Sequence, residues 1–244
     1  MVIKRFLIAL AVLLSVFAIS GQAGLANLAS TPATPVTLTA TDILARASEQ
    51  LADTQTVRFK LEIEGDTYID PGRTLKLLEA EGELARPDRV RTEFKVVALE
   101  RATVTVQLII VSGHWWTTDL VTGEWTDAPV EFEYDPSVLF DNQDGIGPIM
   151  DRVENAERLE DDKLDGRKTY HIRAVVDQEI IGPLTSNTID ATPVTVDLWI
   201  DQETFDVLRA RLAEPEDAPG PDRPATWTLD LFDHGATIEI EPPE

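Results

Sequence analysis

The sequence predicts an α+β protein built on one long, curved antiparallel sheet that carries two or three amphipathic helices. Two observations indicate this class. Apolar and polar residues alternate over six separate segments, which is typical of strands with one covered and one wet face. Two other segments, 39–55 and 135–161, carry apolar residues at helical spacing instead. A mainly antiparallel sheet with a few helices is an α+β arrangement.

The six alternating segments are predicted to be strands. In the first of them, Val57, Phe59 and Leu61 fall on one face, and charged residues fall on the other. The same two-residue period recurs in segments 89–97, 103–111, 169–177, 194–201 and 226–233. The Thr122-Gly123 pair and the polar segment 201–206 are typical of hairpin turns. The chain is therefore expected to be largely a meander.

Segment 39–55 is expected to open the folded domain as a helix, because its apolar residues recur near helical spacing. Thr41 or Asp42 is the expected cap of its first turn. The second helical region, 135–161, is expected to form two short helices. Gly145 and Gly147 interrupt it, and Pro148 suits the first turn of the second helix.

The N-terminus has the layout of an export signal. Lys4 and Arg5 precede an apolar run of fourteen residues, 6–19, and small residues follow. Residues 19–22 resemble the lipobox of bacterial lipoproteins, except that Gln22 takes the position of the lipidated cysteine. Glutamine has no thiol to carry a lipid anchor. We therefore expect an export signal or signal anchor over 1–26, a Thr/Pro-rich tether over 27–38, and a single domain over 39–244.

The composition excludes several classes of protein. The formal net charge of −23 repels nucleic-acid phosphates, so no nucleic-acid partner is expected. The chain has no cysteine, which excludes disulfides, thiol catalysis and Cys-ligated zinc. Its three histidines have no partner at metal-ligand spacing, and no nucleophile or phosphate-loop motif occurs. We expect no metal, no cofactor and no enzymatic activity, with a hydrolase that uses acidic residues as the alternative.

Three segments resemble the LppX/LprA/LprF/LprG family of mycobacterial-type lipoproteins. They are HWWTTDLVTGEWTDAP at 114–129, DPSVLF at 135–140 with the Gly-Ile that follows, and VDLWIDQETFDVLRA at 196–210. The resemblance extends over residues 39–241. It implies a strongly curved half-barrel, similar to the LolA/LolB carriers, with amphipathic helices covering the concave face of the sheet. It also implies that lipid or acylated glycolipid chains are held between the sheet and the helices.

The resemblance implies an exported carrier that moves its lipid across the cell envelope. The expected partners are a lipid or acylated glycolipid, the outer surface of the cytoplasmic membrane as donor, and an envelope transporter. We expect a monomer located outside the cytoplasm. Because an apolar sheet face looks the same over a cavity and over a filled core, the alternative is an envelope interaction or scaffold protein of the same fold.

Strand parity and helix periodicity select the candidate cavity residues. On the strands they are Phe94, Val96, Val106, Leu108, Ile110, Trp116, Ile172, Val196, Leu198 and Ile200, and on the helical region they are Leu139, Phe140, Ile146, Ile149 and Met150. The helical region is the expected moving part, because Gly145 and Gly147 are suited to act as hinges.

Three of the five tryptophans lie between positions 115 and 125. Trp115 and Trp116 are adjacent, so in a strand their rings point to opposite faces. We expect one of them to pack against Trp125 across the Thr122-Gly123 turn, and one to point inward. This predicts a packed hairpin at the edge of the cavity. A flat sugar-stacking platform is the alternative, which the opposed directions of Trp115 and Trp116 disfavour.

Overall fold

The computed structural model describes residues 37–68, 72–99, 101–128, 136–141, 143, 145–185, 187–189, 191–218 and 223–243. Thr37–Glu244 form one compact unit. The predicted export signal and all but the last two residues of the predicted tether lie outside the described residues. Within the described ranges, no helix is both long enough and apolar enough to cross a membrane.

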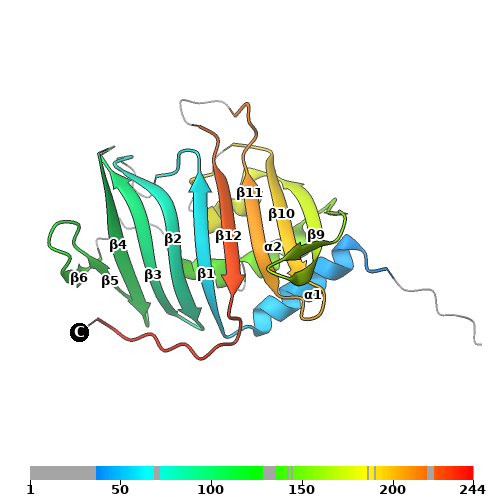
Figure 1. Ribbon diagram of the computed structural model, residues 1–244, viewed down its shortest axis with the longest axis horizontal. Coiled ribbons are helices and arrows are strands. Elements are labelled where there is room, and N and C mark those ends of the chain that lie inside the picture. Colours follow the sequence, from blue (N-terminus) through cyan, green and yellow to red (C-terminus); the bar gives the residue numbers. More distant parts are fainter. Residues whose placement is uncertain are drawn as a thin grey trace, which may run out of the picture. The chain divides into compact units, whose positions relative to one another are not determined.

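Twelve strands form one antiparallel sheet (Figure 1). They are β1 (Thr56–Glu64), β2 (Leu75–Ala85), β3 (Arg89–Ala98), β4 (Ala102–Val111), β5 (His114–Thr118), β6 (Trp125–Asp127), β7 (Glu157–Arg158), β8 (Asp162–Leu164), β9 (Arg167–Val176), β10 (Val194–Asp201), β11 (Val207–Ala213) and β12 (Thr226–Phe232). Their order is β6-β5-β4-β3-β2-β1-β12-β11-β10-β9-β7, and β8 pairs with β9. The described strands thus form an open sheet with two ends. The prediction of one large antiparallel sheet is confirmed.

The centre of the sheet joins segments that are far apart in the chain. β1 pairs with β12 over seven residue pairs, from Arg58 opposite Phe232 to Glu64 opposite Thr226. This pair links the meander β1–β6 to the strands β9–β12. Two expected hairpins are also present: β5 pairs with β6, and β10 pairs with β11.

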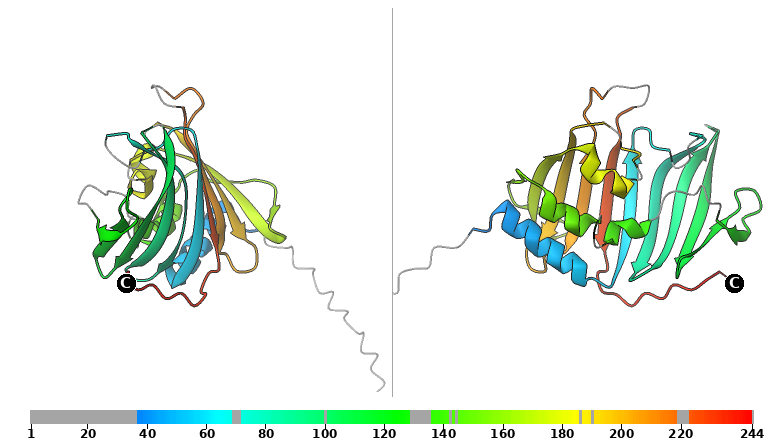
Figure 2. Two further views of the ribbon diagram at one scale, coloured as in Figure 1. Left: turned by 60° about the vertical axis from the view of Figure 1, so that its left-hand side comes forward. Right: turned by 180° about the vertical axis from the view of Figure 1, so that it is seen from behind.

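Five short helical elements accompany the sheet in the described residues. They are α1 (Ala40–Asp53), η1 (Pro136–Phe140), α2 (Ile146–Arg152), α3 (Gln178–Ile181) and η2 (Pro183–Thr185). Figure 2 shows α1 and α2 on the same side of the sheet. The cap of α1 differs from the prediction. Thr39, rather than Thr41 or Asp42, is the N-cap, and it forms a capping box in which Asp42 bonds back to the Thr39 backbone N–H.

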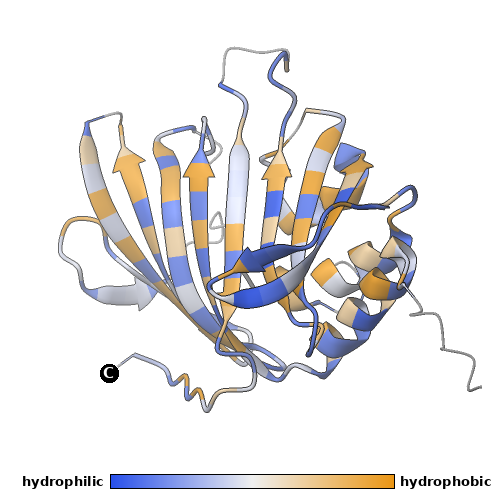
Figure 3. Ribbon diagram, turned by 45° about the vertical axis from the view of Figure 1, so that its right-hand side comes forward, coloured by the Kyte–Doolittle hydropathy of each residue, from blue (hydrophilic) through white to orange (hydrophobic). Residues whose placement is uncertain are grey.

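Apolar residues gather on both faces of the sheet, in two clusters of unequal size. Figure 3 shows the alternation as bands of opposite hydropathy along the strands. The larger cluster, called here the inner core, joins apolar residues of β1–β4 and β9–β12 to those of α1, α2 and α3. The smaller one, called here the outer cluster, contains Ala85, Ile109, Val111 and Ile240, with Trp116, Trp125 and Ile238 packed against them. The helices therefore pack on the inner face.

Several elements were not predicted: β2, the α3–η2 segment, and the short strands β7 and β8. The helical expectation for 135–161 holds only as far as Arg152, because β7 (Glu157–Arg158) pairs with β9. β2 and the α3–η2 segment have irregular sequence patterns. In β2 the register shifts between Leu77 and Glu79, and Gly82 interrupts the apolar positions. A bulge of this kind inverts the alternation that identifies a strand. The α3–η2 segment is too short to show helical periodicity, because α3 has only four residues.

Gly82 of β2 lies where two neighbouring groups approach closely. A Cβ atom at this position would stand 2.3 Å from the carbonyl oxygen of Arg91 and 2.9 Å from Cζ of Phe59. We expect Gly82→Ala to lower the free energy of unfolding by about 1–3 kcal/mol, because the β2–β3 ladder or the Phe59 ring must shift. Urea unfolding measures the change. An unchanged midpoint would show that the sheet absorbs the methyl group without cost.

Candidate functional site

The strongest candidate site is a narrow apolar crevice between the sheet and the helices. Its volume is about 60 Å³, and only Thr185 among its seventeen lining residues is polar. The sheet side is formed by Phe59, Leu61, Val176, Val196, Leu198, Ala210, Leu212, Trp227 and Leu229, and the helix side by Leu139, Ile146, Ile149, Met150, Val153, Ile181, Leu184 and Thr185. Apolar walls of this kind bind apolar ligands and offer few groups for polar recognition.

Six of the fifteen predicted cavity residues line this crevice: Leu139, Ile146, Ile149, Met150, Val196 and Leu198. Seven others belong to the inner core but do not line the crevice: Phe94, Val96, Val106, Leu108, Ile110, Ile172 and Ile200. Phe140 also belongs to the inner core and lines two further clefts. The predicted strand parity therefore holds for these residues, while the position of the crevice along the sheet does not follow from parity.

The prediction for Trp116 needs correction. Trp116 packs against the outer cluster, and Trp115 is the tryptophan that packs against the inner core. The reason is register: Trp115 lies opposite Ile110 of β4, and Trp116 lies opposite Ile109. Trp125 is directly opposite Thr118, so it meets Trp116 diagonally in the outer cluster. The hairpin is packed, as expected, but two of its rings share the outer face.

Residues of the central strands were missed as lining residues. Phe59 and Leu61 of β1, and Trp227 and Leu229 of β12, were recognised only as the apolar faces of strands. The missing information is the β1–β12 pairing, which brings both faces beneath α2 and η1. No local signal in the sequence reports a pairing between strands about 170 residues apart.

The helix side of the crevice is held by hydrogen bonds between α1 and α2. The Ser48 hydroxyl lies 3.0 Å from the carbonyl oxygen of Gly147 and 2.9 Å from a carboxylate oxygen of Asp151, and these two acceptors share its single hydrogen. The first of these bonds is buried. These contacts attach α2 to α1. The apolar side of α2 packs in the inner core, and its polar side contacts α1.

Arg86 lines two clefts that border η1, one of which also borders α2. The clefts have volumes of about 790 and 190 Å³, and Arg86, Phe140 and Asp141 line both. Arg86 donates to the carbonyl oxygen of Thr54 at the end of α1, at 2.9 Å, and its guanidinium lies over the Phe140 ring. Burial lowers the pKa of Arg86, and the Asp141 carboxylate acts in the opposite direction. The clefts thus place a partly desolvated cation next to the crevice.

Asp197 is the centre of a charged cluster on the outer face. Its carboxylate lies 2.9 Å from Nε2 of His171 and accepts hydrogen bonds of 2.8 and 3.0 Å from Arg173. The His171 ring stacks on Trp199. These contacts join β9 to β10 and compensate the burial of Asp197. In the described part of the chain, no group of three His, Cys, Asp or Glu residues is placed to hold a metal ion.

His234 is expected to make the stability of the domain depend on pH. Burial lowers the pKa of His234, and its Nε2 atom is buried with no partner in the described residues. The folded state therefore disfavours the protonated ring. The free energy of unfolding should be at its full value above pH ~6.5 and should decrease as the pH falls below it.

A comparison of urea midpoints at neutral and mildly acidic pH tests this contribution of His234. His234→Gln, which does not titrate, should show a smaller decrease than the unmodified protein over the same interval. Equal decreases in both proteins would assign the pH dependence to other groups.

Comparison with solved structures shows that the fold is shared with two mycobacterial lipoproteins. LprF from Mycobacterium bovis is 18% identical with a TM-score of 0.67, and the match covers 84% of this chain and 96% of that chain. Mycobacterium tuberculosis lipoprotein LppX is 10% identical with a TM-score of 0.58, with coverages of 83% and 98%. At such identities the likeness concerns the fold alone. Among curated proteins, none matches this chain.

The family comparison supports a stronger conclusion than the shared fold, because it compares the sequence itself with a family profile. The profile of the LppX_LprAFG lipoproteins matches residues 39–240, which is most of the chain. This range begins at the N-cap of α1 and extends beyond β12, so it contains every strand and helix described above. The chain therefore belongs to the LppX_LprAFG lipoprotein family.

Proposed function

We propose that this protein is an exported, non-enzymatic carrier that binds the acyl chains of a lipid or acylated glycolipid and moves it across the cell envelope. The observation that carries the proposal is the crevice, in which sixteen of seventeen lining residues are apolar. The chain also belongs to a family of lipoproteins. In this proposal the helices cover the concave face of the sheet, and acyl chains lie between the two. The larger cleft beside Arg86, which is mostly polar, receives the head group.

Loading requires the helices to move. A volume of about 60 Å³ holds roughly four to six water molecules, at about 10–15 Å³ each, which is too little for an acyl chain. We place the movement in η1 and α2, which form much of the helix side of the crevice. Gly145, the N-cap of α2, stands between these two elements and is suited to act as a hinge. The hydrogen bonds of Ser48 resist the movement and favour the closed form.

The proposed location is outside the cytoplasm. The predicted signal supports export, and family members are lipoproteins. Gln22 at the lipobox position leaves the chain without the thiol that a lipid anchor requires. We propose that the protein acts as a monomer, takes lipid from the outer surface of the cytoplasmic membrane, and delivers it with the help of an envelope transporter.

The small volume of the crevice favours a second function. If the inner core is permanently filled, the same fold serves as an interaction or scaffold module of the envelope. A scaffold of this kind would neither acquire lipid nor change its helix packing in the presence of lipid. The two functions therefore differ in a single measurable property, which is whether the inner core accepts an acyl chain.

Native mass spectrometry separates the two functions. The full chain is produced in a host that exports it, purified without detergent, and examined before and after incubation with vesicles of total envelope lipid. The carrier should show added mass that organic extraction removes and identifies as acyl lipid. Transfer of a fluorescent phospholipid between donor and acceptor vesicles then tests movement. A lipid-free mass that stays unchanged after incubation would reject the carrier and favour the scaffold.

A further inference from the structure

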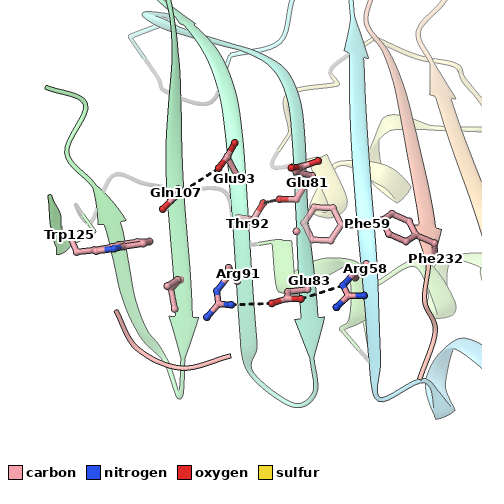
Figure 4. Close-up of a pocket in the computed structure, with 12 residues that line it drawn as sticks. Arg58, Phe59, Glu81, Glu83, Arg91, Thr92, Glu93, Gln107, Trp125 and Phe232 are labelled. Atoms are coloured by element: carbon pink, nitrogen blue, oxygen red, sulfur yellow. Dashed lines mark hydrogen bonds and ion pairs between the residues drawn. The ribbon is translucent and has the colours of Figure 1, made fainter. Parts of the chain in front are cut away.

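The outer face of the sheet carries a groove that the lipid proposal does not use. This outer groove has a volume of about 360 Å³ and crosses β12, β1, β2, β3 and β4 (Figure 4). Neighbouring strands are about 4.8 Å apart, so four spacings make the groove roughly 19 Å long. Phe59 lines both the outer groove and the apolar crevice, which places the two sites back to back. The outer groove is therefore accessible whether or not the crevice holds lipid.

Aromatic side chains stand at both ends of the outer groove. Trp125 of the β5–β6 hairpin is half-buried, and its ring reaches over the sheet toward Gln107 in Figure 4. Phe232 of β12 stands at the other end and is 43% exposed. Trp116 and Ile238 of the outer cluster pack in the same group as Trp125. The Trp125 ring is thus supported from beneath while it lines the groove.

The floor between the two rings combines the apolar side chains of Phe59 and Ile109 with polar side chains of both charges. Glu83 lies between two arginines, 3.5 Å from Nε of Arg58 and 3.3 Å from Nη1 of Arg91. Gln107 donates to Glu93 at 3.2 Å. These contacts hold the side chains in place before any ligand arrives, which lowers the entropy cost of binding. Each guanidinium has five N–H donors and each carboxylate has several lone pairs, so capacity for further hydrogen bonds is left over.

The floor disfavours anionic ligands. Its three carboxylates, of Glu81, Glu83 and Glu93, outnumber its two guanidiniums, and an anion brought to Arg58 or Arg91 also meets Glu83. The overall charge of −23 further disfavours anions. A hydroxyl group is compatible with both kinds of neighbour, because it donates to a carboxylate and accepts from a guanidinium. The exposed rings at the two ends suit a ligand that also has apolar C–H faces.

We propose that the outer groove binds a short stretch of neutral carbohydrate, with one sugar ring against Trp125 and its hydroxyl groups on the floor of Arg58, Glu83, Arg91, Glu93 and Gln107. The site is independent of the lipid proposal, since it lies on the opposite face of the sheet. Trp115 does not interfere with a sugar-binding surface on the outer face, because it packs against the inner core. Trp116 and Trp125 share the outer face. The ligand class is a neutral oligosaccharide, free or as part of a larger glycan.

Isothermal titration calorimetry of the full chain tests the proposal. The probes are neutral hexasaccharides of glucose, mannose and galactose, with a galacturonate hexasaccharide as the anionic comparison. At least one neutral probe should bind at millimolar concentration, and more tightly than the anionic probe. Trp125→Ala should weaken its binding about tenfold, by loss of the aromatic contact. Gln107→Ala, which leaves the hairpin rings intact, should weaken it severalfold.

Trp199→Ala is the matched control. Trp199 is also a partly exposed tryptophan of the outer face, but it stacks on His171 away from the groove. This variant should bind the neutral probe as the unmodified protein does. No binding of any neutral probe up to about 10 mM would overturn the proposal. Tighter binding of the galacturonate probe, or neutral-probe binding that survives both Trp125→Ala and Gln107→Ala, would overturn it as well.

Discussion

Replacing Ala210 with leucine should stabilise the lipid-free protein and weaken its binding of lipid by about tenfold or more, which corresponds to ~1.4 kcal/mol or more. Ala210 lies on β11, is 4% exposed and lines the apolar crevice. The added carbons enter space that is already present, and burial is worth about 0.8 kcal/mol per methylene, so stability should rise by up to about 2 kcal/mol. The same carbons occupy the position proposed for an acyl chain.

Ala174→Leu is the control for Ala210→Leu. Ala174 lies on β9 in the inner core and is 6% exposed, but it does not line the crevice. Added carbons there meet the packed side chains of the inner core, and we expect a loss of about 1–3 kcal/mol with little change in the lipid affinity of the folded protein. Urea unfolding and native mass spectrometry with vesicle lipid measure the two quantities. If Ala210→Leu lowers stability and leaves lipid binding intact, the acyl chain lies elsewhere.

Replacing Trp227 with alanine should produce the largest loss of stability, about 3–5 kcal/mol. Trp227 lies on β12, is 4% exposed, and its ring lines the crevice. Its indole N–H donates to the hydroxyl of Thr67, which is 1% exposed and would lose this partner. The substitution therefore removes the largest side chain of the crevice and leaves a buried polar atom without its donor.

Lipid should restore part of the stability that Trp227→Ala removes. A larger crevice accommodates an acyl chain more easily, and a ligand that binds only the folded state raises its apparent stability. Thermal unfolding with and without vesicle lipid should show a larger increase in melting temperature for Trp227→Ala than for the unmodified protein. Trp227→Phe, which keeps a six-membered ring but loses the hydrogen bond and part of the ring volume, should fall between them. Equal increases in melting temperature in all three proteins would show that Trp227 does not contribute to the lipid site.

The sequence alone predicted much of the fold, because the patterns that identify strands and turns involve residues close together in the chain. The alternation in 57–65, 89–97 and 194–201 reports which side of each strand is covered, and the structure confirms that side for residues such as Phe94 and Leu198. Turn residues such as Thr122-Gly123 report which neighbours pair. Both signals depend only on residues a few positions apart, so they are readable before the chain is folded.

The same reasoning failed where local signals are weak or ambiguous. β2 was missed because its bulge at Leu77 to Glu79 and its Gly82 disturb the alternation. Trp116 was assigned to the wrong face, because adjacent tryptophans satisfy either parity and the choice depends on register against β4. The cap of α1 was placed at Thr41 or Asp42, although Thr39 supplies a complete capping box with Asp42.

By itself, the sequence determined the class of fold, the covered face of most strands and the family. It also determined the absence of thiol chemistry, since the chain contains no cysteine. Only the tertiary structure decided where the apolar crevice lies. That choice depends on the pairing of β1 with β12 and on the seating of α2 and η1 over them, which bring together Phe59, Trp227 and Ile149 from distant parts of the chain. A cavity is the space that packing leaves unfilled, and packing is a property of many residues at once.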